Sequence, residues 1–122
     1  MPINLFDGTM EGLSRALTLR QRQHEVLASN LANIETPGYR ARDLDFRAAL
    51  KEAFAATEDK EGAAAPPARV VEDTQAPARA DGNTVDVDLQ MVKLSANAGA
   101  YTTLARLLKD EFNDLRVAIE GR

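Results

Sequence analysis

The sequence predicts an all-α protein in which two long terminal helices pack as an antiparallel, coiled-coil-like hairpin. Apolar residues recur every three or four positions toward both ends of the 122-residue chain, and this is the spacing of a heptad seam. Between these ends, Pro37 and Gly38 mark a corner, and a Pro/Ala-rich stretch follows a short apolar stripe. We therefore expect a Pro-Gly corner, a short helix and a flexible middle loop between the two long helices.

This pattern divides the chain into three segments. Residues 1–55 are expected to hold the N-terminal long helix, the corner and the short helix, and residues 56–85 a flexible loop and turn. Residues 86–122 are expected to form the C-terminal long helix. Because each long helix has a seam that needs covering, the first and third segments are predicted to form one helical core domain.

The N-terminal helix should end near Glu35, because Thr36 precedes a proline and is disfavoured in the α region. Its expected seam consists of Met10, Leu13, Leu17, Leu27, Leu31 and Ile34. Arg20 and His24 occupy the two middle positions of that seam. For Arg20 we favour solvent exposure, with its stem over the groove. The alternative is a polar register key, a role for which Asn30, Asn33 and Asn97 are also candidates.

The corner Thr36-Pro37-Gly38-Tyr39 suits a type II turn. Proline presets φ at the second position of such a turn, and glycine supplies the positive φ at the third. The Tyr39 ring can then fold over an apolar seam while its hydroxyl reaches a partner. Turn physics explains these four residues but not the string around them.

A short second helix is predicted over Asp43–Ala55. Its apolar stripe consists of Phe46, Ala49, Leu50, Ala53 and Phe54, at the spacing of one helix face. Asp43 or Asp45 is a plausible N-cap.

Residues 56–80 hold three of the five prolines, and Val70 and Val71 are the only apolar pair beyond alanine. Such a stretch buries too little surface to offset its ordering entropy, so we expect a flexible or partner-ordered loop. A two-residue strand around Val70 is possible if another strand pairs with it. Residues 81–83, Asp-Gly-Asn, are expected to turn into an acidic helix start.

The C-terminal helix is predicted over Asp86–Glu120. Its seam keeps the steps of four and three without a break, at Val87, Met91, Leu94, Ala98, Tyr101, Ala105, Leu108, Phe112, Leu115 and Ile119. Acidic residues in its first turn and Gly121 after its last favour these boundaries. A helix of this length runs about 50 Å, so the seam is longer than one small monomer needs.

Composition excludes several classes of function. The net charge of −4 argues against a nucleic-acid partner, and no apolar run reaches the ~20 residues of a bilayer span. With no cysteine and with His24 as the lone histidine, neither thiolate catalysis nor a metal-ligand pattern is present. We therefore expect no enzyme activity and no cofactor. No secretory leader pattern opens the sequence, so export would need another route.

The string SNLANIETPGYRARDLDF, residues 29–46, closely resembles the signature of the bacterial flagellar axial proteins of rod and hook. The residues that carry this likeness, and that it implies act in assembly, are Asn30, Asn33, Thr36, Pro37, Gly38, Tyr39, Asp43 and Phe46. The short length and the final helix look most like a proximal rod member. One departure is Gln90, where an acidic residue would be expected at a helix surface position.

The resemblance implies a structural subunit of the proximal rod of the flagellar basal body, in the periplasm, exported by the flagellar type III apparatus without a cleaved signal peptide. It implies helical assembly into the drive-shaft needed for motility. The implied partners are other copies, other rod proteins, a basal-body adaptor and the inner-membrane ring protein, with no direct membrane insertion. The alternative from the residues alone is a soluble helical-hairpin adaptor or export chaperone.

Overall fold

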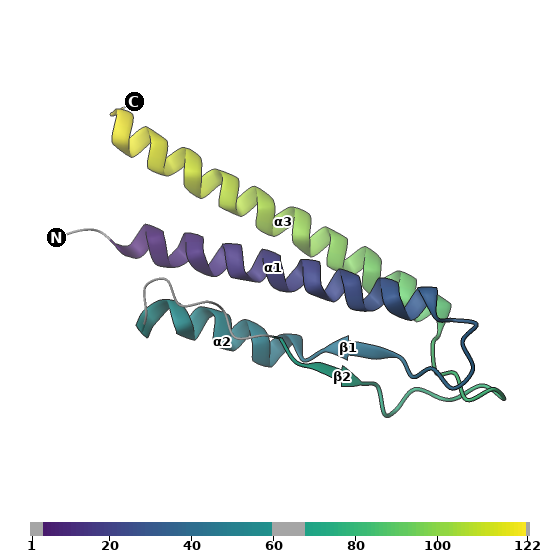
Figure 1. Ribbon diagram of the computed structural model, residues 1–122. Coiled ribbons are helices and arrows are strands. Elements are labelled where there is room, and N and C mark those ends of the chain that lie inside the picture. Colours follow the sequence, from purple (N-terminus) through teal and green to yellow (C-terminus); the bar gives the residue numbers. More distant parts are fainter. Residues whose placement is uncertain (1–3, 60–67, 122) are drawn as a thin grey trace.

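The computed structural model describes residues 4–59 and 68–121 (Figure 1). The elements in chain order are α1 (Asn4–Ala32), β1 (Arg42–Leu44), α2 (Phe46–Asp59), β2 (Val70–Glu72) and α3 (Val87–Glu120). The prediction of a mostly helical chain with a long helix toward each terminus is therefore confirmed.

The long helix α3 runs back beside α1, and the two separate gradually toward the chain ends (Figure 1). Two side-chain contacts mark their alignment. Asn30 of α1 bonds Gln90 near the start of α3, and Arg20 bonds Asn97 one heptad further along it. On its other side, α1 packs against α2 and β1.

The boundaries of α3 follow its caps. The Asp86 carboxylate accepts the N–H of Leu89, while Gly121 has a left-handed φ of 68° and donates its N–H to Val117 O. These groups satisfy backbone donors and acceptors that a helix end leaves without partners. The predicted ends of this helix are thus confirmed, with Asp86 as the capping residue.

A small antiparallel sheet corrects the all-α prediction. Arg42–Leu44 pairs with Val70–Glu72, so that Asp43 lies opposite Val71. The valine pair therefore has a partner strand, and β-branched residues suit it. Because β1 occupies residues 42–44, α2 begins at Phe46 instead of Asp43; it continues to Asp59, beyond the expected end at Ala55. Residues 60–67 of the expected loop lie outside the described residues.

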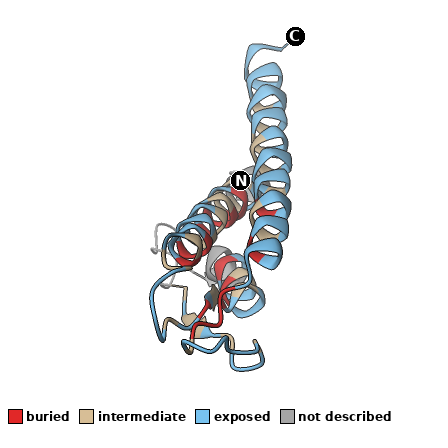
Figure 2. Cartoon of the chain, turned by 90° about the vertical axis from the view of Figure 1, so that its right-hand side faces the viewer, coloured by how far each residue is buried: buried red, intermediate tan, exposed pale blue. Residues whose placement is uncertain are grey.

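The apolar core follows α1 (Figure 2). The buried apolar residues of α1 are Leu13, Ala16, Leu19, Val26 and Leu27. Leu19 packs with Ala49 and Ala53 of α2, so α1 buries a second stripe beside the expected seam. The reason is that α1 has partners on two sides, whereas the heptad pattern accounts for one.

The predicted seam residues are not equally covered. Leu13 and Leu27 are buried, and Leu17, Leu31, Leu94, Leu108 and Leu115 are half-buried. Met91, Tyr101 and Phe112 are exposed. The buried residues of α3 are Gln90 and Asn97, so the surface expectation for Gln90 was wrong. Across residues 4–59 and 68–121, no helix has the length and apolar character of a membrane span.

Leu27 is fully buried. Leu27→Ala should lower the free energy of unfolding by about 2–5 kcal/mol, because it removes apolar contacts and leaves a cavity. Urea denaturation followed by circular dichroism measures this loss. The control Val92→Ala truncates a side chain that is 65% exposed on α3 and should change stability by about 0.5 kcal/mol or less. Equal losses in both variants would contradict the placement of the core.

Candidate functional site

The corner after α1 is a hydrogen-bonded reverse turn. The Tyr39 N–H donates to Thr36 O over 3.2 Å, and Gly38 between them has a φ of 74°. A side chain at position 38 would strain the backbone, because L residues rarely adopt this φ. Thr36, Pro37 and Gly38 are all exposed, so the turn is presented on the surface.

Asn30, in the last turn of α1, is 0% exposed and fixes this corner to the rest of the fold. Its Nδ2 donates to Arg42 O at 2.7 Å and to Gln90 Oε1 at 3.0 Å. Its Oδ1 accepts the Arg42 N–H at 3.0 Å and the Tyr39 hydroxyl at 3.3 Å. An amide side chain has two donor hydrogens and two acceptor lone pairs, so all four are used.

Asn83 performs a similar task at the end of α1. This residue is 0% exposed, and its Nδ2 lies 2.9 Å from Asn33 O, 3.0 Å from Ile34 O and 2.8 Å from Thr36 O. Carbonyls beyond a helix end have no helical donors. Asn83 supplies a donor from about fifty residues away in sequence, and its Oδ1 accepts the Val85 N–H at 2.8 Å.

The loop before α3 is bonded to the corner along its length. Gly38 N–H donates to Asp81 O at 2.9 Å, and Thr84 N–H donates to Tyr39 O at 3.0 Å. The Thr84 hydroxyl accepts the Ala41 N–H at 2.7 Å. The Arg79 guanidinium adds bonds to Ile34 O and Val85 O. We call the side chains of Asn30, Arg79, Asn83 and Thr84 the corner network.

Asp43 of β1 connects three elements of the fold. Its Oδ2 lies 3.0 Å from Lys93 Nζ of α3, and its Oδ1 accepts Gln23 Nε2 of α1 at 3.2 Å. The Asp43 carboxylate also accepts the Leu44 N–H at 2.8 Å. Asp43 therefore links β1 to both long helices. Of the two expected caps of α2, Asp43 is excluded because it lies in β1, whereas Asp45 directly precedes α2 and its carbonyl accepts the Ala49 N–H.

Arg20 lies between the helices, so the solvent-exposed interpretation of this residue was also wrong. Its guanidinium carbon is 3.9 Å from the centroid of the Phe46 ring, and its Nη1 bonds Asn97 Oδ1 at 3.4 Å. Burial lowers the pKa of the Arg20 guanidinium, although arginine still carries its charge at neutral pH. A cation over an aromatic face is attracted to the ring quadrupole.

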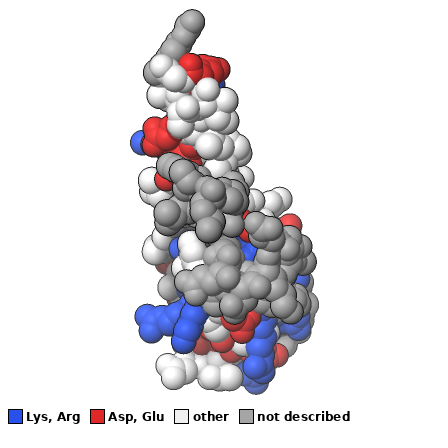
Figure 3. Space-filling view, turned by 90° about the vertical axis from the view of Figure 1, so that its left-hand side faces the viewer, with Lys and Arg blue, Asp and Glu red and all other residues white. Residues whose placement is uncertain are grey.

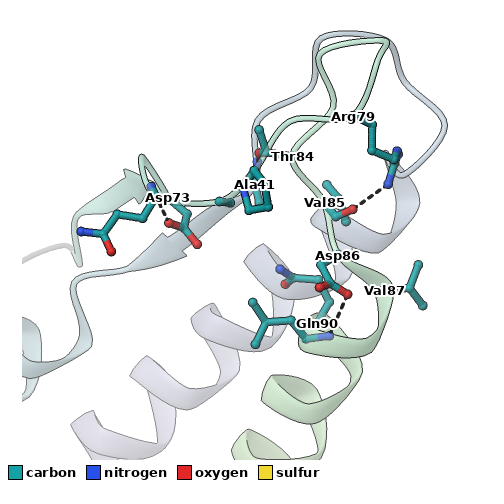
Figure 4. Close-up of a pocket in the computed structure, with 12 residues that line it drawn as sticks. Ala41, Asp73, Arg79, Thr84, Val85, Asp86, Val87 and Gln90 are labelled. Carbon is teal, nitrogen blue, oxygen red and sulfur yellow. Dashed lines mark hydrogen bonds between the residues drawn. The ribbon is translucent and has the colours of Figure 1, made fainter.

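A hollow of about 530 Å³ opens beside the start of α3 (Figure 4). Its lining includes Arg79, Thr84, Asp86, Val87 and Gln90. Several of these side chains are engaged in the bonds just described, and the hollow contains no acid–base or nucleophilic arrangement. Within residues 4–59 and 68–121, no group of three or more His, Cys, Asp or Glu residues could hold a metal ion.

Of the predicted corner residues, Asn30, Thr36, Gly38 and Tyr39 are bonded to one another or to the loop before α3. Phe46 instead lies against Arg20, away from the corner. Asn33 donates to Ser29 O at 2.8 Å and its Oδ1 accepts the Thr36 hydroxyl at 3.1 Å. Sequence reasoning missed Arg79, Asn83, Thr84 and Gln90. Asn83 was interpreted through its local Gly-Asn turn, and that local pattern does not reveal which distant carbonyls its amide contacts.

Comparison with known proteins identifies the family. A model of the family described as "Flagella basal body rod protein" matches residues 10–40. The flagellar basal body rod protein FlgB of Aeromonas hydrophila is 35% identical over 116 residues, which cover 87% of this chain and 88% of that protein. The chain belongs to the FlgB family of flagellar basal body rod proteins. It is a structural rod protein of the flagellar basal body and not an enzyme.

Two further FlgB relatives show how widely the likeness extends. FlgB of Salmonella typhimurium is 31% identical, with coverage of 93% of this chain and 97% of that protein. FlgB of Bacillus subtilis is 28% identical, with 98% of each chain covered. The family model spans most of α1 and the turn after it, and so includes Asn30 and Gly38 of this FlgB-family chain.

Asn30→Ala should lower the free energy of unfolding by at least about 2 kcal/mol, because it leaves Arg42 N–H, Arg42 O and Gln90 Oε1 without their partner at roughly 1–3 kcal/mol per buried group. Urea denaturation measures the loss, and faster amide exchange at Arg42 locates it. The matched control is Asn113→Ala, at an exposed position of α3. Wild-type stability in Asn30→Ala would show that this amide does not hold the corner.

Proposed function

We propose that this chain is a subunit of the proximal rod, in which α1 and α3 form an antiparallel, coiled-coil-like hairpin that packs lengthwise in the wall of a helical tube. The tube would act as the drive-shaft needed for motility. The family membership supports a rod protein, and the length of the two helices supports packing along an axis.

The observation that carries this proposal is the exposed apolar surface of α3. The exposed large apolar residues of this helix are Val87, Leu89, Met91, Val92, Tyr101, Leu107, Phe112, Val117 and Ile119. Ile119, near the C-terminal end, is 77% exposed. In the view of Figure 3, uncharged atoms lie between groups of acidic atoms toward the C-terminal end of α3. Soluble monomers rarely expose so much apolar surface on one helix, whereas interaction surfaces do.

The corner has a complementary role in this proposal. Thr36, Pro37 and Gly38 are exposed, yet their backbone is bonded to the loop that leads into α3. A turn whose backbone is fixed by hydrogen bonds and whose outer surface is exposed can contact a neighbouring subunit without changing its conformation. We propose that residues 36–46 wedge between adjoining subunits.

The proposed partners follow from this position. They are other copies of the chain, other rod proteins, the basal-body adaptor and the inner-membrane ring protein, with the flagellar type III apparatus as the route of export to the periplasmic rod. The export apparatus and the ring protein are expected from the family resemblance alone.

Fractionation separates a rod subunit from a cytoplasmic adaptor or export chaperone. We expect the tagged chain to co-purify with basal bodies, and deletion of its gene to remove the rod above an intact membrane ring in electron micrographs. Retention of the chain in the cytoplasm, with complete rods in the deletion strain, would favour the adaptor instead.

Gly38→Val should abolish swimming while the protein is still exported, because a β-branched residue resists the φ of 74° at this position. Motility in soft agar and the amount of exported protein are the two measurements. Gly38→Asn is the matched variant, since asparagine tolerates positive φ better, and it should retain more motility than valine. Normal swimming of Gly38→Val would exclude a structural requirement for the corner.

A further inference from the structure

The most deeply buried residues of α3 are polar. Gln90 is 2% exposed and Asn97 is 3% exposed, and they are the buried residues of α3. They lie one heptad apart in sequence. Apolar residues of the same helix, such as Met91 and Phe112, are more than half exposed. Leu94, Leu108 and Leu115 are half-buried, so the most deeply buried positions of α3 hold amides where an amphipathic helix usually holds apolar side chains.

Each buried amide has a specific partner on α1. Asn30 Nδ2 donates to Gln90 Oε1 over 3.0 Å. Asn97 Nδ2 donates to Arg20 O over 2.8 Å, and its Oδ1 accepts Arg20 Nη1 over 3.4 Å. We call these contacts the polar pairs, Asn30–Gln90 and Arg20–Asn97.

The polar pairs distinguish between alignments of α3 with α1 that the apolar seam of α3 would permit equally. The predicted seam of α3, from Val87 to Ile119, repeats every three or four residues without a break, so a shift by one heptad keeps apolar residues in equivalent positions. The same shift would bring Asn97 opposite Asn30 and Leu104 opposite Arg20. Leucine offers the Arg20 guanidinium no acceptor, and Gln90 would lose its partner.

Arg20 and Asn30, the partners on α1, are also held by contacts that do not involve α3. Arg20 lies over the Phe46 ring at 3.9 Å and bonds Gln23 of its own helix at 3.3 Å. Asn30 is fixed by both backbone groups of Arg42. A second copy of α3 would present neither Arg20 nor the Asn30–Arg42 arrangement. If a second α3 took the place of α1, Gln90 and Asn97 would lose these partners, and a buried amide left without a partner is costly.

We propose that Gln90 and Asn97 determine partner and register: they make α3 pair with α1 of its own chain in one alignment, and they disfavour slipped pairing and pairing with α3 of a second copy. The exposed apolar residues of α3, such as Met91, Phe112 and Ile119, thereby stay on the outside of the hairpin. Buried polar residues fix register and oligomer state in coiled coils by the same penalty. This inference concerns pairing within the chain and does not depend on the proposed place in the rod.

The test uses the purified full chain and the double variant Gln90→Leu/Asn97→Leu. Because the sequence has no cysteine, spin labels can be attached at Ala28→Cys and Thr103→Cys, two exposed positions on α1 and α3. Double electron–electron resonance then reports the alignment of the helices, and light scattering over a concentration series reports mass. A slip of one heptad moves one label by about 10 Å along the helix axis.

The matched control is Ser95→Leu/Thr102→Leu, which adds two leucines at the same spacing on exposed positions of α3. We expect one distance and the monomer mass for the unsubstituted chain and for the control. The Gln90/Asn97 variant should show a second distance displaced by about 10 Å, or a dimer mass with distances between singly labelled chains. A single unshifted distance and an unchanged mass would overturn the proposal.

Two other outcomes are also decisive. If the control associates as strongly as the Gln90/Asn97 variant, apolar surface alone explains the effect and the proposal fails. Gln90→Ala/Asn97→Ala removes the amides without adding apolar surface, and it is measured in the same way. If both the leucine and alanine variants lose their helical circular dichroism, the pairs are needed for folding itself and the proposal is overturned.

Discussion

The arrangement of this chain depends on one buried amide. Asn30 is fully buried and makes four hydrogen bonds, to two backbone groups of Arg42, to Tyr39 and to Gln90. Through these bonds the last turn of α1 sets the position of the corner, of β1 and of the start of α3. A saturated amide is stable inside a protein, whereas the loss of any one partner leaves an expensive unpaired group. The geometry of three elements is consequently coupled.

Much of the fold follows from local patterns in the sequence. The heptad spacing predicts both long helices, and Asp86 and Gly121 mark the ends of α3 because capping uses neighbouring residues. The family string, too, identifies Asn30 and Tyr39 as corner residues. What local patterns do not contain is the partner across space. Asn83 serves carbonyls about fifty residues away, and Arg20 is covered because α2 places Phe46 beneath it. Likewise, the local sequence suggested a strand at Val70 but did not indicate that residues 42–44 would pair with it.

The same distinction explains where the heptad pattern misled. A heptad seam predicts that its apolar residues are covered by another helix, but it does not say whether that helix belongs to the same chain. Leu27 is buried within the chain, whereas Phe112 is exposed in it. Conversely, Leu19 lies off the expected seam and is buried because α2 covers α1 from a second side. The heptad spacing of a helix therefore does not by itself predict which of its residues are buried within the single chain.

Two glycines give the corner its compact form. Gly38 and Gly82 both have positive φ, and a Cβ added at Gly82 would lie 3.4 Å from Gly38 Cα. The two turns therefore approach each other at backbone distance, and Gly38 N–H bonds Asp81 O across the contact. Because backbone hydrogen bonds hold this contact, its outer face leaves Thr36 and Pro37 exposed without weakening it. A corner of this kind can be stiff and still offer its surface to a neighbour, which side-chain packing alone would not permit.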